Sequence, residues 1–95
     1  MMRVRFTARA LGDLDDIYDF IAKDSKVYAN KTVAELITFT RGLAKFPDAG
    51  RLEMLPDGTL LRERLFRNYR LTYHTIDGIL EIITVQHFAR ISEEA

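Results

Sequence analysis

Five arginines and two histidines in the second half of the chain are the residues best suited to carry chemistry. Four of the arginines lie within residues 62–70, where Glu63 is the one acidic residue. Guanidinium groups bind phosphates and carboxylates through paired hydrogen bonds, and histidine exchanges protons near neutral pH. The segment therefore predicts a surface that binds an anionic target. The residues are Arg62, Arg64, Arg67, Arg70 and Arg90, with His74 and His87.

These residues lie on three strand-like runs joined by short connections. Leu60–Phe66, Tyr69–Thr75 and Leu80–Phe88 are rich in β-branched, aromatic and other apolar side chains. Asp77 and Gly78 separate the last two runs, and this pair favours a tight hairpin because both residues accept a positive φ. The pattern predicts an antiparallel meander of three strands.

Alternation along a strand assigns the arginines to a face of the sheet. Arg62 and Arg64 lie at alternate positions of one run, as do Arg70 and His74 of the next. We expect the positions between them to face the core, so that the arginines share the opposite, open face. The alternative is an ordinary solvated face on which arginines form ion pairs with nearby glutamates. These glutamates are Glu53, Glu63 and Glu81.

His87 lies near the end of the last run, at alternate positions with Ile83 and Val85. We expect it to face the core, where a histidine is more often a hydrogen-bonded structural group than a proton-transfer group. The same reservation applies to His74. Ile82 and Ile83 are adjacent apolar residues, which predicts burial on both faces, as in a central strand.

The first half of the chain predicts a short strand and two helices. Met2–Phe6 alternates charged and apolar residues. Thr7 can cap a helix over Ala8–Ala22, and a second amphipathic helix follows over Lys26–Ala44. Arg51–Leu55 is either a short strand or irregular. The order β-α-α-β-β-β predicts an α+β domain with the helical hairpin on one face of a small antiparallel sheet.

The composition limits the class of protein. The 95 residues are 47% hydrophobic and 29% charged with zero formal net charge, which is typical of one globular domain over residues 1–95. The aspartates of the first helix read as a solvated surface, and cysteine is absent, so we expect neither a metal nor a cofactor. No apolar run has the roughly 20 residues of a membrane span, and the first residues lack an apolar signal core. We expect a cytoplasmic protein.

Short motifs spread over nearly the whole chain give it a resemblance to a known family. It resembles the RelE/ParE superfamily of toxins from bacterial type II toxin–antitoxin systems, which are often labelled plasmid stabilisation proteins. The motifs are A-x-x-D-L on the first helix, L-x-x-x-P-x-x-G-R at the exit of the second, Y-R-L-x-Y in the middle strand and V-x-H-x-x-R at the end. They start at Ala10, Leu43, Tyr69 and Val85.

The resemblance implies a small sheet packed by two N-terminal helices, in agreement with the pattern above. Members of the superfamily poison either DNA gyrase or translating ribosomes, and a cognate antitoxin holds the toxin inactive. The ribosome-dependent members cleave mRNA by activating the ribose 2′-hydroxyl against the adjacent phosphate. By this resemblance Arg70 and Arg90 correspond to phosphate ligands of the nucleases, and His87 is the first remaining candidate for proton transfer.

Departures from the nuclease pattern favour the gyrase branch. The lysines that nucleases carry in the strand before Y-R are not evident in Leu60–Phe66, and residues 91–95 contain no counterpart of their C-terminal tyrosine. The V-x-H-x-x-R ending is similar to that of gyrase-poisoning members. We therefore expect a non-enzymatic inhibitor of DNA gyrase that an antitoxin neutralises. The alternatives are a ribosome-dependent mRNA endonuclease and a non-toxic binding module of the same fold.

Overall fold

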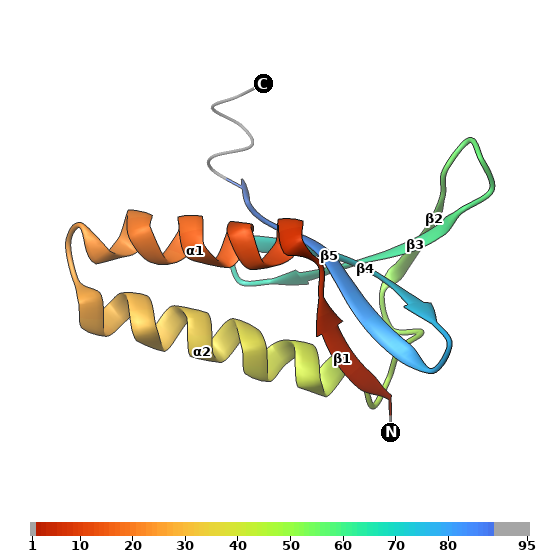
Figure 1. Cartoon of the computed structure of the whole chain (residues 1–95), viewed down its shortest axis with the longest axis horizontal. Helices are drawn as coiled ribbons and strands as arrows, with labels where there is room; N and C mark the ends of the chain where they lie inside the picture. The colour runs from red at the N-terminus through yellow and green to blue at the C-terminus, as the bar shows by residue number, and fades with distance from the viewer. Residues whose placement is uncertain (1, 89–95) are drawn as a thin grey trace.

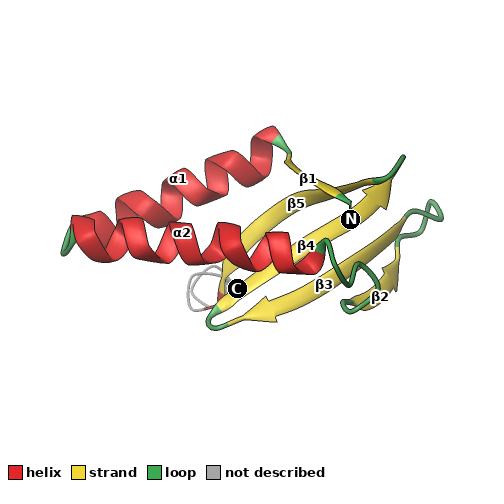
Figure 2. Ribbon diagram, turned by 90° about the horizontal axis from the view of Figure 1, so that it is seen from below, coloured by secondary structure: helices red, strands yellow, loops and turns green. Residues whose placement is uncertain are grey.

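The computed structural model describes residues 2–88, in which two helices lie on one face of a five-stranded sheet (Figure 1). Figure 2 shows the helices as one layer and the sheet as the other. The predicted helices are confirmed to within one residue, and so is the α+β fold class. The elements are β1 (Arg3–Phe6), α1 (Ala8–Ala22), α2 (Lys26–Leu43), β2 (Arg51–Met54), β3 (Leu60–Phe66), β4 (Tyr69–Ile76) and β5 (Ile79–His87).

Both helices begin at a side chain that caps their first turn. The Thr7 hydroxyl accepts a hydrogen bond from the backbone N–H of Ala10 at 3.0 Å, and the Ser25 hydroxyl accepts one from Tyr28 at 3.1 Å. Each contact satisfies one of the backbone donors that the start of a helix leaves free. The short connection over residues 23–25 reverses the chain, so the two helices form the predicted hairpin.

The strands follow the order β1-β5-β4-β3-β2. Neighbours from β2 to β5 are antiparallel, but β1 pairs in parallel with β5, with Arg3 opposite Ile79 and Phe6 opposite Ile82. The sheet is therefore mixed and not wholly antiparallel. No tight turn joins β1 to β5, so nothing local imposes an antiparallel direction on this pair. The sequence leaves Arg51–Leu55 open between a strand and irregular structure, and Arg51–Met54 form the edge strand β2.

Positive φ angles mark the two hairpin turns of the meander. Asp77 and Gly78 have φ angles of 50° and 75° between β4 and β5, which confirms the predicted tight turn. Arg67 has a φ of 55° between β3 and β4, a left-handed conformation that is uncommon for a residue with a Cβ. Both loops contain two residues, so each sets the register of the strands that it joins.

The core lies between the helices and the sheet. Leu71, Tyr73, Leu80 and Ile82 of β4 and β5 are 0% exposed. Burying a large apolar side chain contributes about 1.5–3 kcal/mol, so these positions dominate the stability of the layer contact. They pack against apolar stripes on the two helices. The buried residues of these stripes are Ala10, Leu14, Ile17, Leu36 and Leu43.

β5 lies between β1 and β4, as predicted for an inner strand, but a β-bulge changes the predicted burial of Ile82 and Ile83 on both faces. Tyr73 lies opposite Ile82, whereas Thr72 lies opposite Thr84, so Ile83 has no partner on β4. The extra residue shifts the alternation by one position. Ile82 is fully buried and Ile83 is half-buried. The adjacent isoleucines therefore reflect an inserted residue in the strand.

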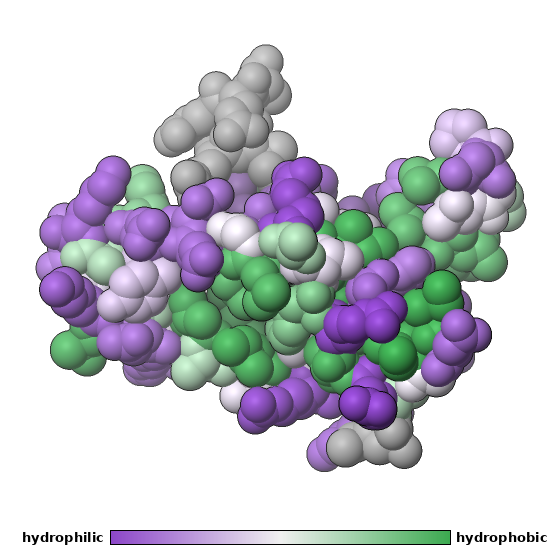
Figure 3. All heavy atoms as spheres, viewed as in Figure 1, coloured by the Kyte–Doolittle hydropathy of each residue, from purple (hydrophilic) through white to green (hydrophobic). Residues whose placement is uncertain are grey.

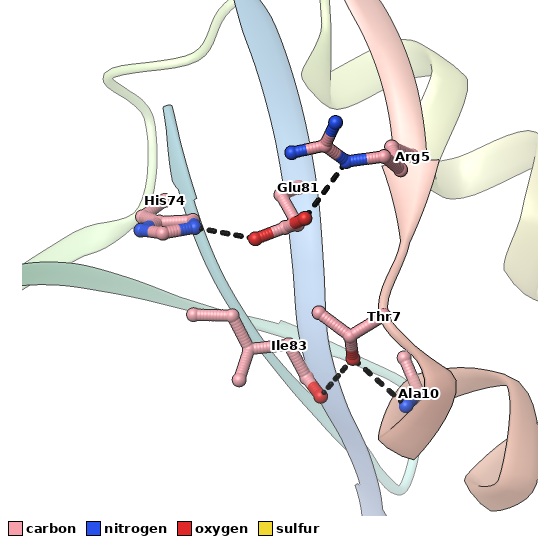
Figure 4. Close-up of polar contacts among 6 residues, drawn as sticks. All are labelled: Arg5, Thr7, Ala10, His74, Glu81 and Ile83. Atoms are coloured by element: carbon pink, nitrogen blue, oxygen red, sulfur yellow. Dashed lines mark hydrogen bonds and ion pairs between the residues drawn. The ribbon is translucent and has the colours of Figure 1, made fainter. Parts of the chain in front are cut away.

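Where β1 ends, polar side chains of the β1–α1 junction bond the backbone groups of β5 that a longer β1 would have bonded. The Thr7 hydroxyl donates to the Ile83 carbonyl at 2.9 Å (Figure 4). Asp13 Oδ2 accepts a hydrogen bond from the backbone N–H of Val85 at 2.9 Å. Both backbone groups lie beyond the last residue of β1, Phe6, and would otherwise lack a strand partner. Asp13 is thus a structural residue and an exception to the solvated surface predicted for the first helix.

The hydroxyl of Tyr73 connects the loop after α2 to the sheet. It donates a hydrogen bond to the Pro47 carbonyl at 3.0 Å and accepts one from the Gly50 N–H at 2.9 Å. Gly50 is required because a Cβ at this position would lie 2.5 Å from the hydroxyl oxygen. This buried contact therefore accounts for the glycine of the motif at the exit of α2.

We expect Tyr73→Phe to lower the free energy of unfolding by about 1–3 kcal/mol, because two backbone groups lose their hydrogen-bond partner. Urea denaturation followed by circular dichroism measures the change. The control is Tyr28→Phe, since the Tyr28 side chain is exposed and its hydroxyl has no hydrogen bond within residues 2–88. Similar losses in the two variants would contradict a specific role for the Tyr73 contact.

Candidate functional site

The arginines of the β3–β4 hairpin lie on both faces of the sheet, so the expectation that they share the open face is wrong. Arg62 lies opposite Tyr73 and Arg64 opposite Leu71, and both partners are buried under the helices. Arg70 alternates with these buried residues along β4 and lies on the open face. The predicted cluster is therefore divided between two surfaces.

The signal for this division is present in the sequence. A loop of two residues, Arg67 and Asn68, makes Phe66 and Tyr69 direct cross-strand neighbours. Counting back from this pair places both arginines of β3 on the face of the buried tyrosines. The prediction failed because it placed apolar residues such as Leu65 in the core, whereas Leu65 is 54% exposed.

Arg62 holds the loop that follows α2. Its Nη1 donates to the carbonyl of Gly50 at 2.9 Å and to that of Asp48 at 3.2 Å, and its Nη2 lies 3.4 Å from Asp48 Oδ1. These contacts use the guanidinium within the chain itself. Arg62 therefore contributes to the conformation of the loop more than to an open binding surface.

Arg67 and Arg64 lie along the edge between the sheet and α2. Arg67 forms an ion pair with Glu35 of α2, and its guanidinium carbon lies 5.1 Å from the centre of the Phe66 ring. Arg64 is exposed and forms no ion pair with another described residue. It lines a hollow of about 300 Å³ with Phe39 and other residues of the α2 exit. Arg64 is thus the member of this group that is available to a partner.

On the open face, Arg70 faces a carboxylate and an aromatic ring. Its Nε lies 3.4 Å from Glu63 Oε1, and its guanidinium carbon lies 5.3 Å from the centre of the Phe88 ring. Glu63 Oε1 also lies 3.8 Å from Arg51 Nη2. This is the ion-paired, solvated face that the sequence left as the alternative. The Arg70 side chain remains 36% exposed, so an anionic target can still reach it.

Glu81 connects β1 and β4 across the same face (Figure 4). Arg5 Nε donates to Glu81 Oε2 at 2.8 Å, and His74 Nε2 lies 2.8 Å from Glu81 Oε1. The hydrogen bond with His74, and then that with Arg5, lowers the pKa of Glu81. Pairing with a fixed carboxylate orients the His74 ring. Arg5 and Glu81 were not among the predicted site residues, and the parallel pairing of β1 with β5 is what brings them together.

Neither histidine shares a site with Arg70. His74 lies four residues along β4, which at about 3.3 Å per residue is about 13 Å away. His87 lies opposite Tyr69 on the helix-facing side, with ring centres 5.1 Å apart in an edge-to-face contact. A single phosphate group cannot contact Arg70 and either histidine at once in this arrangement.

His87 lines a hollow of about 180 Å³ beneath the helical hairpin, together with Ile17, Tyr28 and Thr32. His87 is half-buried on the helix-facing side, so the expectation that it faces the core is correct in direction. Its ring borders this hollow. The Nδ1 of His87 and the Oγ1 of Thr32 are buried without a hydrogen-bond partner among the described residues. A group that enters the hollow would therefore meet both apolar walls and polar atoms.

The remaining predictions concern Arg90, metal binding and membrane spans. Arg90 lies outside the described residues, so its place relative to Arg70 stays a prediction. Within residues 2–88, no three histidine, aspartate or glutamate side chains are grouped as metal ligands. No helix of the described part is long and apolar enough to cross a membrane.

The Glu81 contacts predict a pH-dependent contribution to stability. Because the folded pKa is lowered, this contribution is full above the ordinary glutamate value of about 4.3 and is lost as the pH falls through the lowered pKa. The stability gap between wild type and Glu81→Gln should therefore shrink below about pH 4. Thermal melts over a pH series measure it. In a His74→Phe background this pH dependence should be weaker, and a constant gap would contradict the assignment.

Comparisons with known proteins agree with this architecture. The sequence profile described as "ParE toxin of type II toxin-antitoxin system, parDE" matches residues 4–91. Toxin RelE2 of Caulobacter vibrioides is 34% identical over 91 residues, which cover 96% of this chain and 100% of the relative. Putative toxin Y4kP of Sinorhizobium fredii is 36% identical over 87 residues, which cover 90% of this chain and 86% of the relative.

Two solved structures share the fold. A chain of the chromosomal ParDE TA system from P. aeruginosa has a TM-score of 0.74 at 24% identity, with coverage of 92% of this chain and 96% of that chain. The YoeB/ParE toxin from Agrobacterium tumefaciens has a TM-score of 0.53 at 22% identity, with coverage of 90% and 98%. At these identities the structures establish the fold, whereas the profile and the relatives establish the family. The chain belongs to the ParE toxin family of type II toxin–antitoxin systems, within the RelE/ParE superfamily.

Proposed function

We propose that this toxin inhibits DNA gyrase and does not itself cleave mRNA. The observation that carries the proposal is the separation of both histidines from Arg70 among the described residues. The open face offers a guanidinium group that can bind an anionic target, but neither histidine lies beside it within residues 2–88, and the carboxylate that does, Glu63, is paired with Arg51 and Arg70. Family membership also implies a cognate antitoxin that holds the toxin inactive.

The chemistry of RNA cleavage explains why this separation matters. A ribosome-dependent nuclease has to take a proton from the ribose 2′-hydroxyl and supply one to the leaving oxygen. Arginine is poorly suited to either step because its pKa exceeds about 12. The His74 side chain is hydrogen-bonded to Glu81, and His87 lies on the opposite side of the sheet from Arg70. A gyrase inhibitor needs no such group, since the topoisomerase itself breaks the DNA strand.

Ribosome-dependent mRNA cleavage is the second candidate, and one comparison favours it. The relative from Caulobacter vibrioides has the name Toxin RelE2. In this case Arg70 and Arg90 would hold the phosphate and His87 would transfer the proton. That mechanism requires His87 to reach the face of Arg70, away from the hollow beside Tyr69.

The apolar surface between α2 and β3 supports binding of the antitoxin. The rings of Phe39 and Phe66 stack with their centres 4.5 Å apart and line an open hollow of about 450 Å³, together with Lys31 and Arg67. An amphipathic helix buries a stripe of apolar side chains in such a groove. We propose that an antitoxin segment covers this surface, and that the chain acts as one toxin domain in the cytoplasm.

Expression of the chain alone in a bacterial host should stop growth, and co-expression with the small protein encoded beside it should restore growth. The physical reason is that an antitoxin bound along α2 and β3 keeps the toxin from its target. Growth curves after induction measure the effect. Normal growth in the presence of soluble, folded protein would contradict toxicity and favour the non-toxic binding module.

Arg70→Ala tests the open face within the same assay. A half-exposed ion pair contributes about 0–1 kcal/mol, so the variant should melt close to wild type. It should nevertheless lose toxicity, because a guanidinium that meets an anionic group contributes about 1.5–3 kcal/mol. We expect the same loss for Arg90→Ala. The control Arg41→Ala, at an exposed arginine of α2 outside the predicted set, should stay toxic. A large drop in the melting temperature of Arg70→Ala would make Arg70 a structural residue.

Two assays on purified protein distinguish the targets. We expect inhibition of gyrase supercoiling with accumulation of cleaved DNA, and intact mRNA in a translating extract analysed by primer extension. His87→Ala is the informative variant for the second assay. Codon-positioned cuts that disappear in His87→Ala would overturn the gyrase assignment and make this protein an enzyme.

A further inference from the structure

β2 is an edge strand whose outer side pairs with no other strand among residues 2–88. All four of its residues are exposed, and its neighbour in the sheet is β3. The N–H of Leu55 donates to the Thr59 carbonyl at 2.8 Å, so the backbone groups of odd-numbered residues in this ribbon point toward β3. The N–H and C=O groups of Leu52 and Met54 therefore point away from the sheet. An edge of this kind can pair with another strand.

The same edge exposes apolar side chains. Leu52, Met54 and Leu60 are 52%, 68% and 50% exposed. Met54 lies opposite Leu60, and Leu52 lies two residues from Met54, so the three side chains share one face of the ribbon. The ribbon extends away from the helices in Figure 1, and Figure 3 shows apolar side chains on it. Exposed apolar clusters on a soluble domain commonly mark an interaction surface.

The charges of β2 are self-complementary. Arg51 and Glu53 flank Leu52 on the opposite face of the strand. When two copies of β2 pair antiparallel with Leu52 opposite Leu52, Arg51 of each copy lies opposite Glu53 of the other. Oppositely charged cross-strand neighbours stabilise a pair, whereas like charges destabilise it. We propose that this protein forms a dimer through β2, on a two-fold axis that passes between the Leu52 residues.

The neighbouring registers are less favourable. A shift of two residues, which keeps the outward backbone groups aligned, places either Glu53 opposite Glu53 or Arg51 opposite Arg51 across the two-fold axis. The register centred on Arg51 would pair Leu52 with the backbone of Gly50, whose N–H is already bonded to Tyr73 and whose carbonyl accepts from Arg62. In the Leu52-centred register this conflict is confined to the outer pair of Gly50 with Met54, and the central Leu52 pair is free of it. The Leu52-centred register satisfies the charges and joins the exposed leucine side chains.

A dimer through β2 aligns the open faces of its two copies, which is a property beyond the proposed function. A two-fold axis between antiparallel edge strands runs perpendicular to the sheet, so the two sheets continue into one another with the same face on the same side. The open faces, each with Arg70, then point in one direction. A dimer of this kind presents two copies of the candidate target surface to one partner.

A charge-exchange experiment tests the register. Sedimentation of the purified full chain should show a mass that rises with concentration from 11.0 kDa toward twice this value. Arg51→Glu and Glu53→Arg should each stay monomeric, because like charges then face each other twice. An equimolar mixture of the two variants should associate, since the all-acidic strand now faces the all-basic strand. The double variant R51E/E53R should associate with itself.

The variant Arg51→Glu has a matched control. Arg3→Glu makes the same charge change at an exposed residue on the opposite edge of the sheet and should dimerise as wild type does. Thermal melts verify that the variants fold, and Glu53→Arg is independent of the Arg51–Glu63 ion pair. A wild-type chain that stays monomeric at all concentrations would overturn the proposal. A mixture of the single variants that fails to associate would also overturn it.

Discussion

The register of the β3–β4 hairpin is the constraint on which the rest of the structure depends. The two-residue turn at Arg67 and Asn68 makes Phe66 face Tyr69, and every later pair along the two strands follows from this one. The tyrosines of β4 have to fill the core, so the side chains opposite them lie on the helix-facing side whatever their charge. For this reason Arg62 and Arg64 lie beside the α2 exit, and Arg70 is left on the open face.

The open face that results is ordered by carboxylates. Glu63 lies between Arg51 and Arg70, and Glu81 lies between Arg5 and His74. The half-exposed ion pair between Glu63 and Arg70 contributes little to stability, about 0–1 kcal/mol. An anionic target can therefore displace Glu63 from Arg70 at small cost. The carboxylates orient the basic groups, which remain available to a target.

The motifs that revealed the family are mostly structural. In the A-x-x-D-L motif, Asp13 accepts a hydrogen bond from the backbone of β5 just beyond the end of β1. In the motif at the exit of α2, Gly50 leaves space for the Tyr73 hydroxyl. Tyr69 and Tyr73 of the Y-R-L-x-Y motif lie in the core. Such residues serve the fold and not the recognition of a target. This explains why the motifs identify the superfamily and leave the choice between gyrase and the ribosome to the open face and the histidines.

The sequence by itself determined the helices, the hairpin turns, the fold class and the resemblance to the family. These features depend on local patterns: capping by Thr7 and Ser25, apolar periodicity, and the positive φ that Asp77 and Gly78 accept. The length of the two-residue loop at Arg67 also sets the register of β3 and β4, although the pattern of apolar residues in β3 predicted the opposite assignment of faces.

Only the tertiary structure decided how distant segments meet. The parallel pairing of β1 with β5 brings Arg5 to Glu81, and the bulge at Ile83 changes which residues of β5 are buried. The free edge at β2 likewise follows from the order of the strands. These contacts join residues far apart in the chain, and no local preference specifies them. They form because the core has to exclude water while each backbone group keeps a hydrogen-bond partner.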